Sequence, residues 1–323
     1  MQRAKSACGD CESSVTRRNF LRTAGAVAAV GALGIPTLAT AAPTPKSTAE
    51  SAVARFHASL TAEQKKVVAF DFDHELRKRL NANWHITKPS IDDKFYTADQ
   101  RQIIHEIIKG VLSPEGYEKI QKQTEYDNGG LGAYSVAMFG DPATGKFEWE
   151  LTGRHLTLRA DGDSVDKAAF GGPIVYGHGN DSAKQNLFYD QTLQVNELFK
   201  GLDAKQAAAA LVAKAPNESA VPLQGAKGTF PGISVKELSS DQKGLVEKTI
   251  KSLLSIYRQE DVDEVLAIIK AGGGLDALHF AFYQQGDLDN DKVWDIWRVE
   301  GPNVAWHFRG APHVHAYINI GVG

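Results

Sequence analysis

The sequence predicts an α+β fold made of two diverged repeats, each with helices followed by an antiparallel β-hairpin. Three observations support this prediction: a repeated helix-start motif, an apolar stripe at helical spacing after it, and alternating strand patterns after the stripe. The repeats cover about residues 51–160 and 193–310 of a single domain, 51–323. Because helices precede hairpins in both halves, we expect the strands to form one shared antiparallel core.

Four short motifs mark the helix starts. Each has the form of a capping box, in which a Ser, Thr or Asp caps the helix and a Gln three residues later reaches back to the cap amide. The caps are Thr61 and Thr97 in the first half and Asp203 and Ser239 in the second. Both pairs, Thr61 with Asp203 and Thr97 with Ser239, are 142 positions apart, which indicates an internal repeat.

Helix and strand periodicities follow the second cap of each half. Apolar residues recur at helical spacing from Ile103 to Leu112 and from Leu245 to Leu254. Strands are predicted by alternation at 133–139, 147–151, 153–158, 278–283, 293–299, 301–308 and 312–320. The glycine-rich segment 171–179 is expected to be a loop that approaches a ligand closely.

The N-terminus has the layout of a twin-arginine export signal. Arg17 and Arg18 precede an apolar stretch from Ala24 to about Leu38, and a small-residue site ends at Ala41. The stretch is too short for a membrane anchor, so we expect removal of residues 1–41 and no membrane span after processing. The expected partner is the twin-arginine export machinery, and the mature protein is expected to be periplasmic or secreted.

The composition of the mature chain limits its chemistry. Residues 42–50 are predicted to be a flexible tether. Processing removes Cys8 and Cys11, the only cysteines, so a metal would have to be held by His, Asp or Glu. The formal net charge is −3, and no basic block occurs. We therefore expect a small molecule or a protein as ligand, and no nucleic acid.

Several segments resemble known binding or catalytic motifs but lack residues that those motifs require. The segment from Gly140 to Lys146 lacks the Ser or Thr of a phosphate-binding loop and is followed by a strand, which indicates a hairpin turn. The segment from Asp287 to Asp291 lacks the glycine and the glutamate of a calcium loop. No zincin histidine pair and no nucleophile elbow occurs. The histidines are therefore the main chemical signal.

His313 and His315 lie two positions apart in a β-prone run, so both imidazoles are expected on one face of a strand, where they can bind one metal ion. A polar strand face is the simpler interpretation of such a pair in isolation. Four other histidines add to the signal through their positions on matching hairpins, in the glycine-rich loop or after Trp84. They are His155, His279, His178 and His85.

A set of motifs in fixed order resembles one bacterial family. The motifs are Trp84-His85 and the segments 153–162, 171–178, 275–280, 297–302 and 309–315. On these motifs the chain is similar to exported proteins grouped as domain of unknown function 3500, from about Ser51 to the C-terminus. The resemblance implies export but no particular reaction. Much of that family has a double histidine where this chain has Arg154-His155, which implies a subgroup.

We expect an exported metalloprotein, and a metalloenzyme if the site also holds a substrate. The best-supported ligands are His155, His279, His313 and His315, with His85 and His178 as further ligands or proton-transfer groups. The donor set favours Cu, Zn or Fe. Arg154, Arg309 and His178 are the catalytic candidates, because an arginine can hold an anionic substrate or developing negative charge. Pairing of the arginines with acids such as Glu150 or Glu300 is the structural alternative.

A second hypothesis is a non-catalytic periplasmic binding protein with an aromatic-lined pocket. It depends on tryptophans at alternating strand positions, a pattern that also places them in the core. They are Trp149, Trp294, Trp297 and Trp306. Metal content distinguishes this hypothesis from the metalloprotein.

Overall fold

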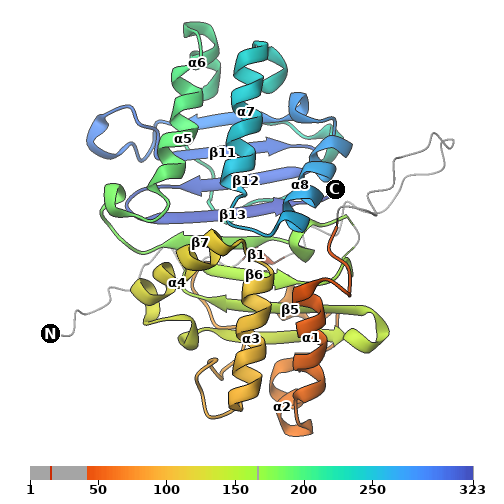
Figure 1. Ribbon diagram of the computed structural model, residues 1–323. Helices are drawn as coiled ribbons and strands as arrows, with labels where there is room; N and C mark the ends of the chain where they lie inside the picture. The colour runs from red at the N-terminus through yellow and green to blue at the C-terminus, as the bar shows by residue number, and fades with distance from the viewer. Residues whose placement is uncertain (1–14, 17–41, 166, 323) are drawn as a thin grey trace, which may run out of the picture.

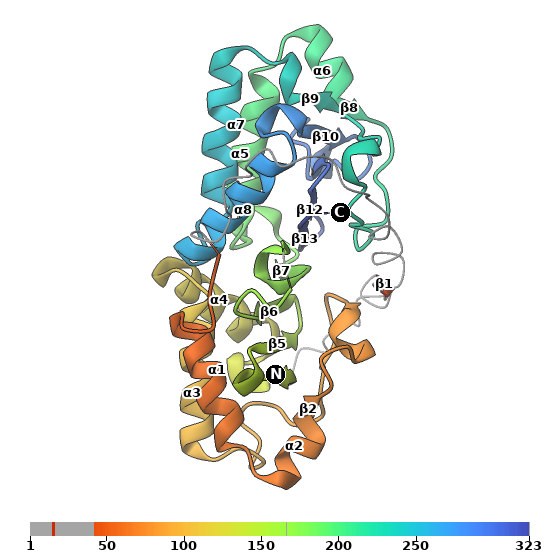
Figure 2. The same ribbon diagram turned by 90° about the vertical axis from the view of Figure 1, so that its right-hand side faces the viewer.

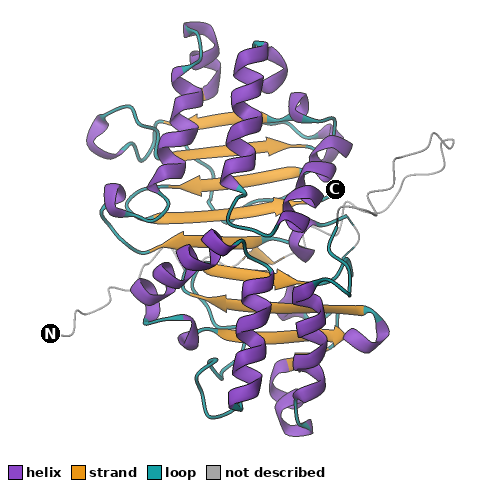
Figure 3. Cartoon of the chain, viewed as in Figure 1, coloured by secondary structure: helices purple, strands orange, loops and turns teal. Residues whose placement is uncertain are grey.

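The structure is a computed structural model that describes residues 15–16, 42–165 and 167–322. The predicted cleavage point, the arginine pair, Cys8 and Cys11 lie outside the described residues. The described chain is a mixed α/β structure with eight helices and an 11-stranded sheet (Figure 1). The helices form one layer in front of the sheet (Figure 3). The fold therefore has two layers around a single main core.

The bounds of the elements are as follows. The helices are α1 (Thr48–Ser59), α2 (Ala62–Val68), α3 (Ala98–Gly110), α4 (Pro114–Asn128), α5 (Tyr189–Lys200), α6 (Ala204–Ala210), α7 (Ser240–Leu253) and α8 (Gln259–Ala271). The strands are β1 (Val15–Thr16), β2 (Ala69–Phe70), β3 (Arg79–Leu80), β4 (Ser135–Asp141), β5 (Lys146–Gly153), β6 (Leu156–Ala160), β7 (Ile174–His178), β8 (Leu211–Val212), β9 (Ile233–Ser234), β10 (His279–Tyr283), β11 (Ile296–Gly301), β12 (Val304–Arg309) and β13 (Val314–Ile320). Strands β1 and β3 form a separate pair.

The large sheet has the order β2-β4-β5-β6-β7-β13-β12-β11-β10-β8, and β9 pairs with β10. Strands of the first half lie on one side of the β7–β13 contact and strands of the second half on the other. The β7–β13 pair is antiparallel, whereas β2–β4 and β8–β10 are parallel. The sheet is therefore mixed, which corrects the expectation of a wholly antiparallel core. The two parallel pairs arise because β2 and β8 each follow a short helix rather than a hairpin turn.

All four predicted capping boxes are present, at Thr61, Thr97, Asp203 and Ser239. In the first half, the amides of Gln64 and Gln100 donate reciprocal hydrogen bonds of 2.9 Å. In the second half, Gln206 and Gln242 do the same at 3.2 and 2.8 Å. Each capping glutamine thus fixes a helix start and also ties it to the neighbouring helix start.

The two faces of the sheet differ in chemistry. The face under the helices carries the main apolar core, which includes all four tryptophans of the binding-protein hypothesis, namely Trp149, Trp294, Trp297 and Trp306. The alternating strand positions of these tryptophans therefore place them in the core, as the simpler interpretation of the pattern has it. The opposite face is covered by irregular segments, seen away from the helix layer in Figure 2. Arg298 donates to backbone oxygens of two residues in these segments, Asn217 and Ala220.

Two local expectations are corrected by the structure. Residues 174–178 of the glycine-rich segment form strand β7 and not a loop. A Cβ on Gly177 would collide with the carbonyl oxygen of Val314, so this glycine permits close strand pairing rather than ligand approach. Helix α1 begins at Thr48, within the segment 42–50 that we predicted as a tether. Glu50 is buried there and pairs with Arg258 at 2.7 Å.

Candidate metal centre

Three histidines from distant parts of the chain converge at the middle of the sheet. His155 lies in the turn between β5 and β6, His313 directly precedes β13, and His315 is near the start of that strand. One ring nitrogen from each lies within 4.8 Å of those from the other two. The ring centroids are 4.7 to 5.1 Å apart, and all three residues are buried. Among the described residues, these three histidines form the one cluster of potential metal ligands.

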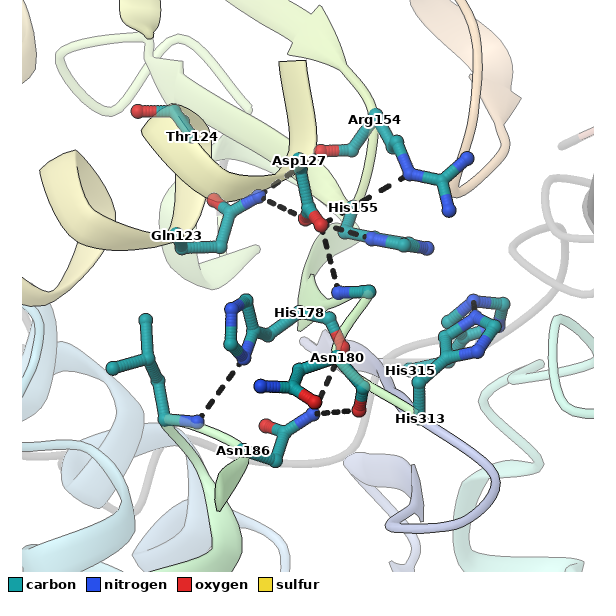
Figure 4. Close-up of polar contacts among 12 residues, drawn as sticks. Gln123, Thr124, Asp127, Arg154, His155, His178, Asn180, Asn186, His313 and His315 are labelled. Carbon is teal, nitrogen blue, oxygen red and sulfur yellow. Dashed lines mark hydrogen bonds and ion pairs between the residues drawn. The ribbon is translucent and has the colours of Figure 1, made fainter. Parts of the chain in front are cut away.

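The backbone and a carboxylate hold His155 in place. Its φ of 57° is left-handed, and its amide donates to Ala82 O at 2.6 Å. Its Nδ1 lies 2.8 Å from Asp127 Oδ2 at the end of α4 (Figure 4). Asp127 also accepts from Gln123 Nε2 at 2.7 Å and from Gly179 N at 2.8 Å. The strained turn is thus anchored to a helix end and to a loop.

The other two histidines each have a carboxylate at Nδ1. His313 Nδ1 lies 3.3 Å from Asp181 Oδ1, and His315 Nδ1 lies 2.7 Å from Glu218 Oε1. Arg309 Nη2 also lies 2.8 Å from His315 Nδ1. Nδ1 of His315 can therefore donate to the carboxylate or accept from the guanidinium. The first tautomer leaves the Nε2 lone pair available to a ligand.

The inner nitrogens face one another. His313 Nε2 and His315 Nε2 are 3.0 Å apart. His155 Nε2 is buried and has no hydrogen-bond partner within the described part of the chain. An ionised carboxylate can only accept, so Nδ1 of His155 carries the proton and Nε2 presents a lone pair. A carboxylate beside the outer nitrogen of each metal-facing imidazole is the second-shell pattern of histidine metal sites.

The environment favours neutral imidazoles. Burial lowers the pKa of His155 from 6.5, although the hydrogen bond to Asp127 opposes this shift. Burial, with the positive charge of Arg309 added, lowers the pKa of His313 to about 4 and that of His315 well below 6.5. Burial raises the pKa of Asp127, but the contacts with His155, Gln123 and the Gly179 amide together lower it below its ordinary value of 3.8. Neutral imidazole is the form that binds a metal.

Two family models match the chain, one near its N-terminus and one over most of its length. A family model for a twin-arginine translocation pathway signal sequence matches residues 14–34. The family model described as Protein of unknown function (DUF3500) matches residues 42–318. The chain belongs to the DUF3500 family. This DUF3500 protein carries a signal for export by the twin-arginine machinery, and no helix among its described residues has the length and apolarity to cross a bilayer. No match was found among curated proteins or solved structures.

Three of the predicted histidine ligands lie apart from the cluster. His279 is on β10, which β11 and β12 separate from β13, and strand spacing alone puts it at least roughly 14 Å away. His178 pairs in register with Val314 and so lies on the helix face, where its Nδ1 accepts from Leu187 N at 3.1 Å. His85 is exposed on a loop. These positions prevent His279 and His178 from sharing one ion with the cluster in this DUF3500 protein.

The two predicted arginines have different surroundings. Arg309 is buried and pairs with Glu218, Nε to Oε2 at 3.2 Å. It therefore orients Glu218 and His315. Arg154 approaches Asp127 only at 4.0 Å, and its side chain retains 20% exposure. The two acids offered as structural partners have arginine partners of their own, since Glu150 pairs with Arg159 and Glu300 with Arg298.

Sequence reasoning missed the three carboxylates at the outer nitrogens. They are separated from their histidines by 28, 132 and 97 residues, for Asp127, Asp181 and Glu218 respectively. Such separations leave no local pattern to detect. A buried histidine on β12, His307, was also missed. Its Nδ1 accepts from Arg298 Nε at 2.9 Å, so it belongs to a paired network and not to the cluster.

Proposed function

We propose that this exported protein binds one transition-metal ion through Nε2 of His155, His313 and His315. The observation that supports the proposal most is the division of roles between the ring nitrogens. Each Nδ1 lies beside a carboxylate, His313 Nε2 and His315 Nε2 are 3.0 Å apart, and the three buried rings each bring one nitrogen within 4.8 Å of the other two. A buried lone pair without a partner, as at His155 Nε2, is unfavourable unless a ligand completes it.

The donor set restricts the metal. Three neutral nitrogens without a thiolate suit Zn or Cu and also Fe, and the general affinity order favours Cu over Zn. Three histidines with a fourth position left open is the arrangement of catalytic zinc sites, in which the ion lowers the pKa of a bound water. The carboxylates Asp127, Asp181 and Glu218 would orient the ligands and raise their basicity. The same arrangement would therefore support a metalloenzyme.

Metal content tests the proposal. Protein exported through its own signal and purified without chelator should contain about one Cu, Zn or Fe per chain by elemental analysis. Replacement of His155, His313 or His315 by Ala should each lower the retained metal sharply, because each loss opens a coordination position. His178→Ala and His279→Ala are matched controls that should retain it. Equal retention in all five variants, or none in the wild type, would overturn the proposal.

We also infer that the chain arose by internal duplication, with β7 and β13 as the equivalent inner strands. The reciprocal glutamine pairs support this, since Gln64 with Gln100 and Gln206 with Gln242 form the same contact in both halves. The sheet order supports it as well, because it runs outward through corresponding strands on both sides of the β7–β13 pair. An experimental structure tests the inference: residues 48–178 should superpose on 189–320 after a rotation of about 180°.

A further inference from the structure

Arg154 lies at the solvent-facing edge of the histidine cluster. The side chains of His155 and His315 are fully buried, whereas that of Arg154 is 20% exposed. The Arg154 backbone is fixed, because its carbonyl oxygen accepts from Tyr134 Oη at 2.7 Å and from Gln123 Nε2 at 3.2 Å. A ligand that reaches the cluster from solvent would therefore meet a charged group on a rigid backbone.

The guanidinium is a neighbour of the His155 ring. A Cβ built on Gly179 would lie 3.2 Å from both Arg154 Nη2 and His155 Cε1. Both groups thus border the same small space, which exists only because residue 179 lacks a side chain. Figure 4 shows Arg154 and His155 projecting on the same side of their turn. A molecule bound at the inner nitrogen of His155 would lie within reach of this guanidinium.

The hydrogen-bond donors of Arg154 are largely unused. Among the described residues, its one ion-pair approach is Nε to Asp127 Oδ1 at 4.0 Å, which is too long for a hydrogen bond. Arg309, by contrast, is held by Glu218 and His315. Arg154 is therefore the arginine at this site whose planar fork is available for a ligand.

The charge around the cluster points to the class of that ligand. Three carboxylates lie beside the ring nitrogens of the cluster: Asp127, Asp181 and Glu218. Two guanidinium groups approach these carboxylates, Arg154 at Asp127 and Arg309 at Glu218. With neutral imidazoles and a divalent ion, the assembly carries one net positive charge. An oxyanion that binds the metal through one oxygen would neutralise this charge and accept hydrogen bonds from Arg154.

We propose that Arg154 binds an oxyanion, a carboxylate or a phosphate, at the open coordination position of the metal. This inference rests on the proposed metal site. Arg154 Nη1 and Nη2 donate to the anion, and the metal holds a second oxygen. The exposed edge beside Asp181, whose side chain is 83% exposed, provides the route of entry.

The test uses the cobalt-loaded protein, because visible absorption of Co(II) reports on changes in its ligands. Acetate and inorganic phosphate are titrated separately into the wild type, Arg154→Gln and Arg154→Lys, which also shows which anion binds better. Loss of a charged hydrogen bond predicts roughly 10–100-fold weaker anion binding in Arg154→Gln. Arg154→Lys keeps the positive charge but cannot donate two parallel hydrogen bonds, so its anion affinity should lie between those of the wild type and Arg154→Gln. Arg55→Gln, at an exposed remote site, is the matched control.

The outcomes separate this inference from the metal site itself. Cobalt affinity should be the same in wild type and Arg154→Gln, measured by competition with a chelator, and thermal unfolding should show that both are folded. Equal anion affinity in the two proteins would overturn the role of Arg154 and leave the metal site standing. Failure of the wild type to bind cobalt would overturn the metal site, and this inference with it.

Discussion

Two buried polar groups on the sheet differ in how their members are paired. The first is an ion-pair network at β5 and β6, in which Arg77 Nη1 lies 3.0 Å from Glu148 Oε2 and Arg159 Nη2 lies 3.1 Å from Glu150 Oε1. Arg159 also contacts Glu148 and donates from Nε to Pro173 O at 2.8 Å. Each charge in this network meets an opposite charge.

The histidine cluster is built differently. Its outer nitrogens meet carboxylates, but its inner nitrogens meet one another, or no partner in the case of His155 Nε2. The inner side of the cluster thus holds one hydrogen bond between two neutral rings and one buried nitrogen without a partner among the described residues. The comparison teaches that complete pairing indicates a structural role, whereas pairing on one side only indicates a place for a ligand.

The largest expected effect tests the structural half of this comparison. Arg159→Met leaves Glu148 and Glu150 buried without their main partner, and loss of one partner of a buried pair typically lowers the free energy of unfolding by about 3–5 kcal/mol. Urea unfolding measures the change. Metal content should be unaffected in molecules that remain folded.

Arg55→Met is the control for that experiment. Its ion pair with Glu106 is exposed on both sides, with side-chain exposures of 57% and 38%, so its loss should hardly change the unfolding midpoint. If Arg159→Met and Arg55→Met lowered the free energy of unfolding equally, the buried network would stabilise the fold no more than an exposed ion pair does.

The next effect concerns the ligand half of the comparison. Asp127→Asn keeps a hydrogen-bond acceptor for His155 but removes the charge that raises its basicity. Metal affinity should fall by about 10–100-fold. Stability without metal should fall by about 1–3 kcal/mol, because the amide nitrogen of Asn must face one of the N–H groups that Asp127 accepts. Isothermal titration with Zn²⁺ and urea unfolding in chelator measure the two quantities. Asp190→Asn, at an exposed position on α5, should bind like the wild type, and unchanged affinity in Asp127→Asn would make Asp127 a structural partner only.

The smallest effect concerns His307, a buried histidine that is paired and so belongs with the first group. Burial lowers its pKa well below 6.5, and Arg298 and Arg309 lower it further. The unfolded chain therefore takes up a proton below about pH 6.5 and the folded chain does not, so acid favours unfolding. Below pH 6.5, this histidine should lower the free energy of unfolding by up to about 1.4 kcal/mol for each pH unit.

His307→Gln should remove that slope. Urea unfolding of metal-free protein at pH 7, 6 and 5 measures it as the difference between variant and wild type. His74→Gln, at an exposed position, controls for the substitution itself. Loss of metal in His307→Gln would mean that His307 supports the metal site, which would contradict its assignment to the paired structural residues.

Much of the local structure could be predicted from the sequence. The four helix starts were predicted because a capping box involves residues only three positions apart. The hairpin strands were predicted by alternation, although their bounds shifted by a few residues, as at β11 (Ile296–Gly301). Segment 171–179 was misjudged, because its glycines are typical of a loop and only the packing against Val314 shows why a strand needs Gly177.

The candidate site could be predicted only in part. His313 and His315 were expected side by side, since strand periodicity fixes the relation between residues two apart, and their Nε2 atoms are 3.0 Å apart. His279 and His178 were grouped with them because nothing in a single sequence states which strands are neighbours or which face pairs with which. The sheet order places His279 three strands away from the cluster, and the pairing of His178 with Val314 places it on the helix face.

The sequence by itself therefore determined the export signal, the helix starts, the strand alternation and the side-by-side histidines, because each depends on residues within one turn or one strand. Only the tertiary structure decided that His155 joins His313 and His315, and that Asp127, Asp181 and Glu218 support them. These contacts depend on the pairing of β7 with β13, which joins the two halves of the chain. Strand pairing of this kind is set by the packing of the whole sheet, since the backbone hydrogen bonds that form it are the same for every residue type.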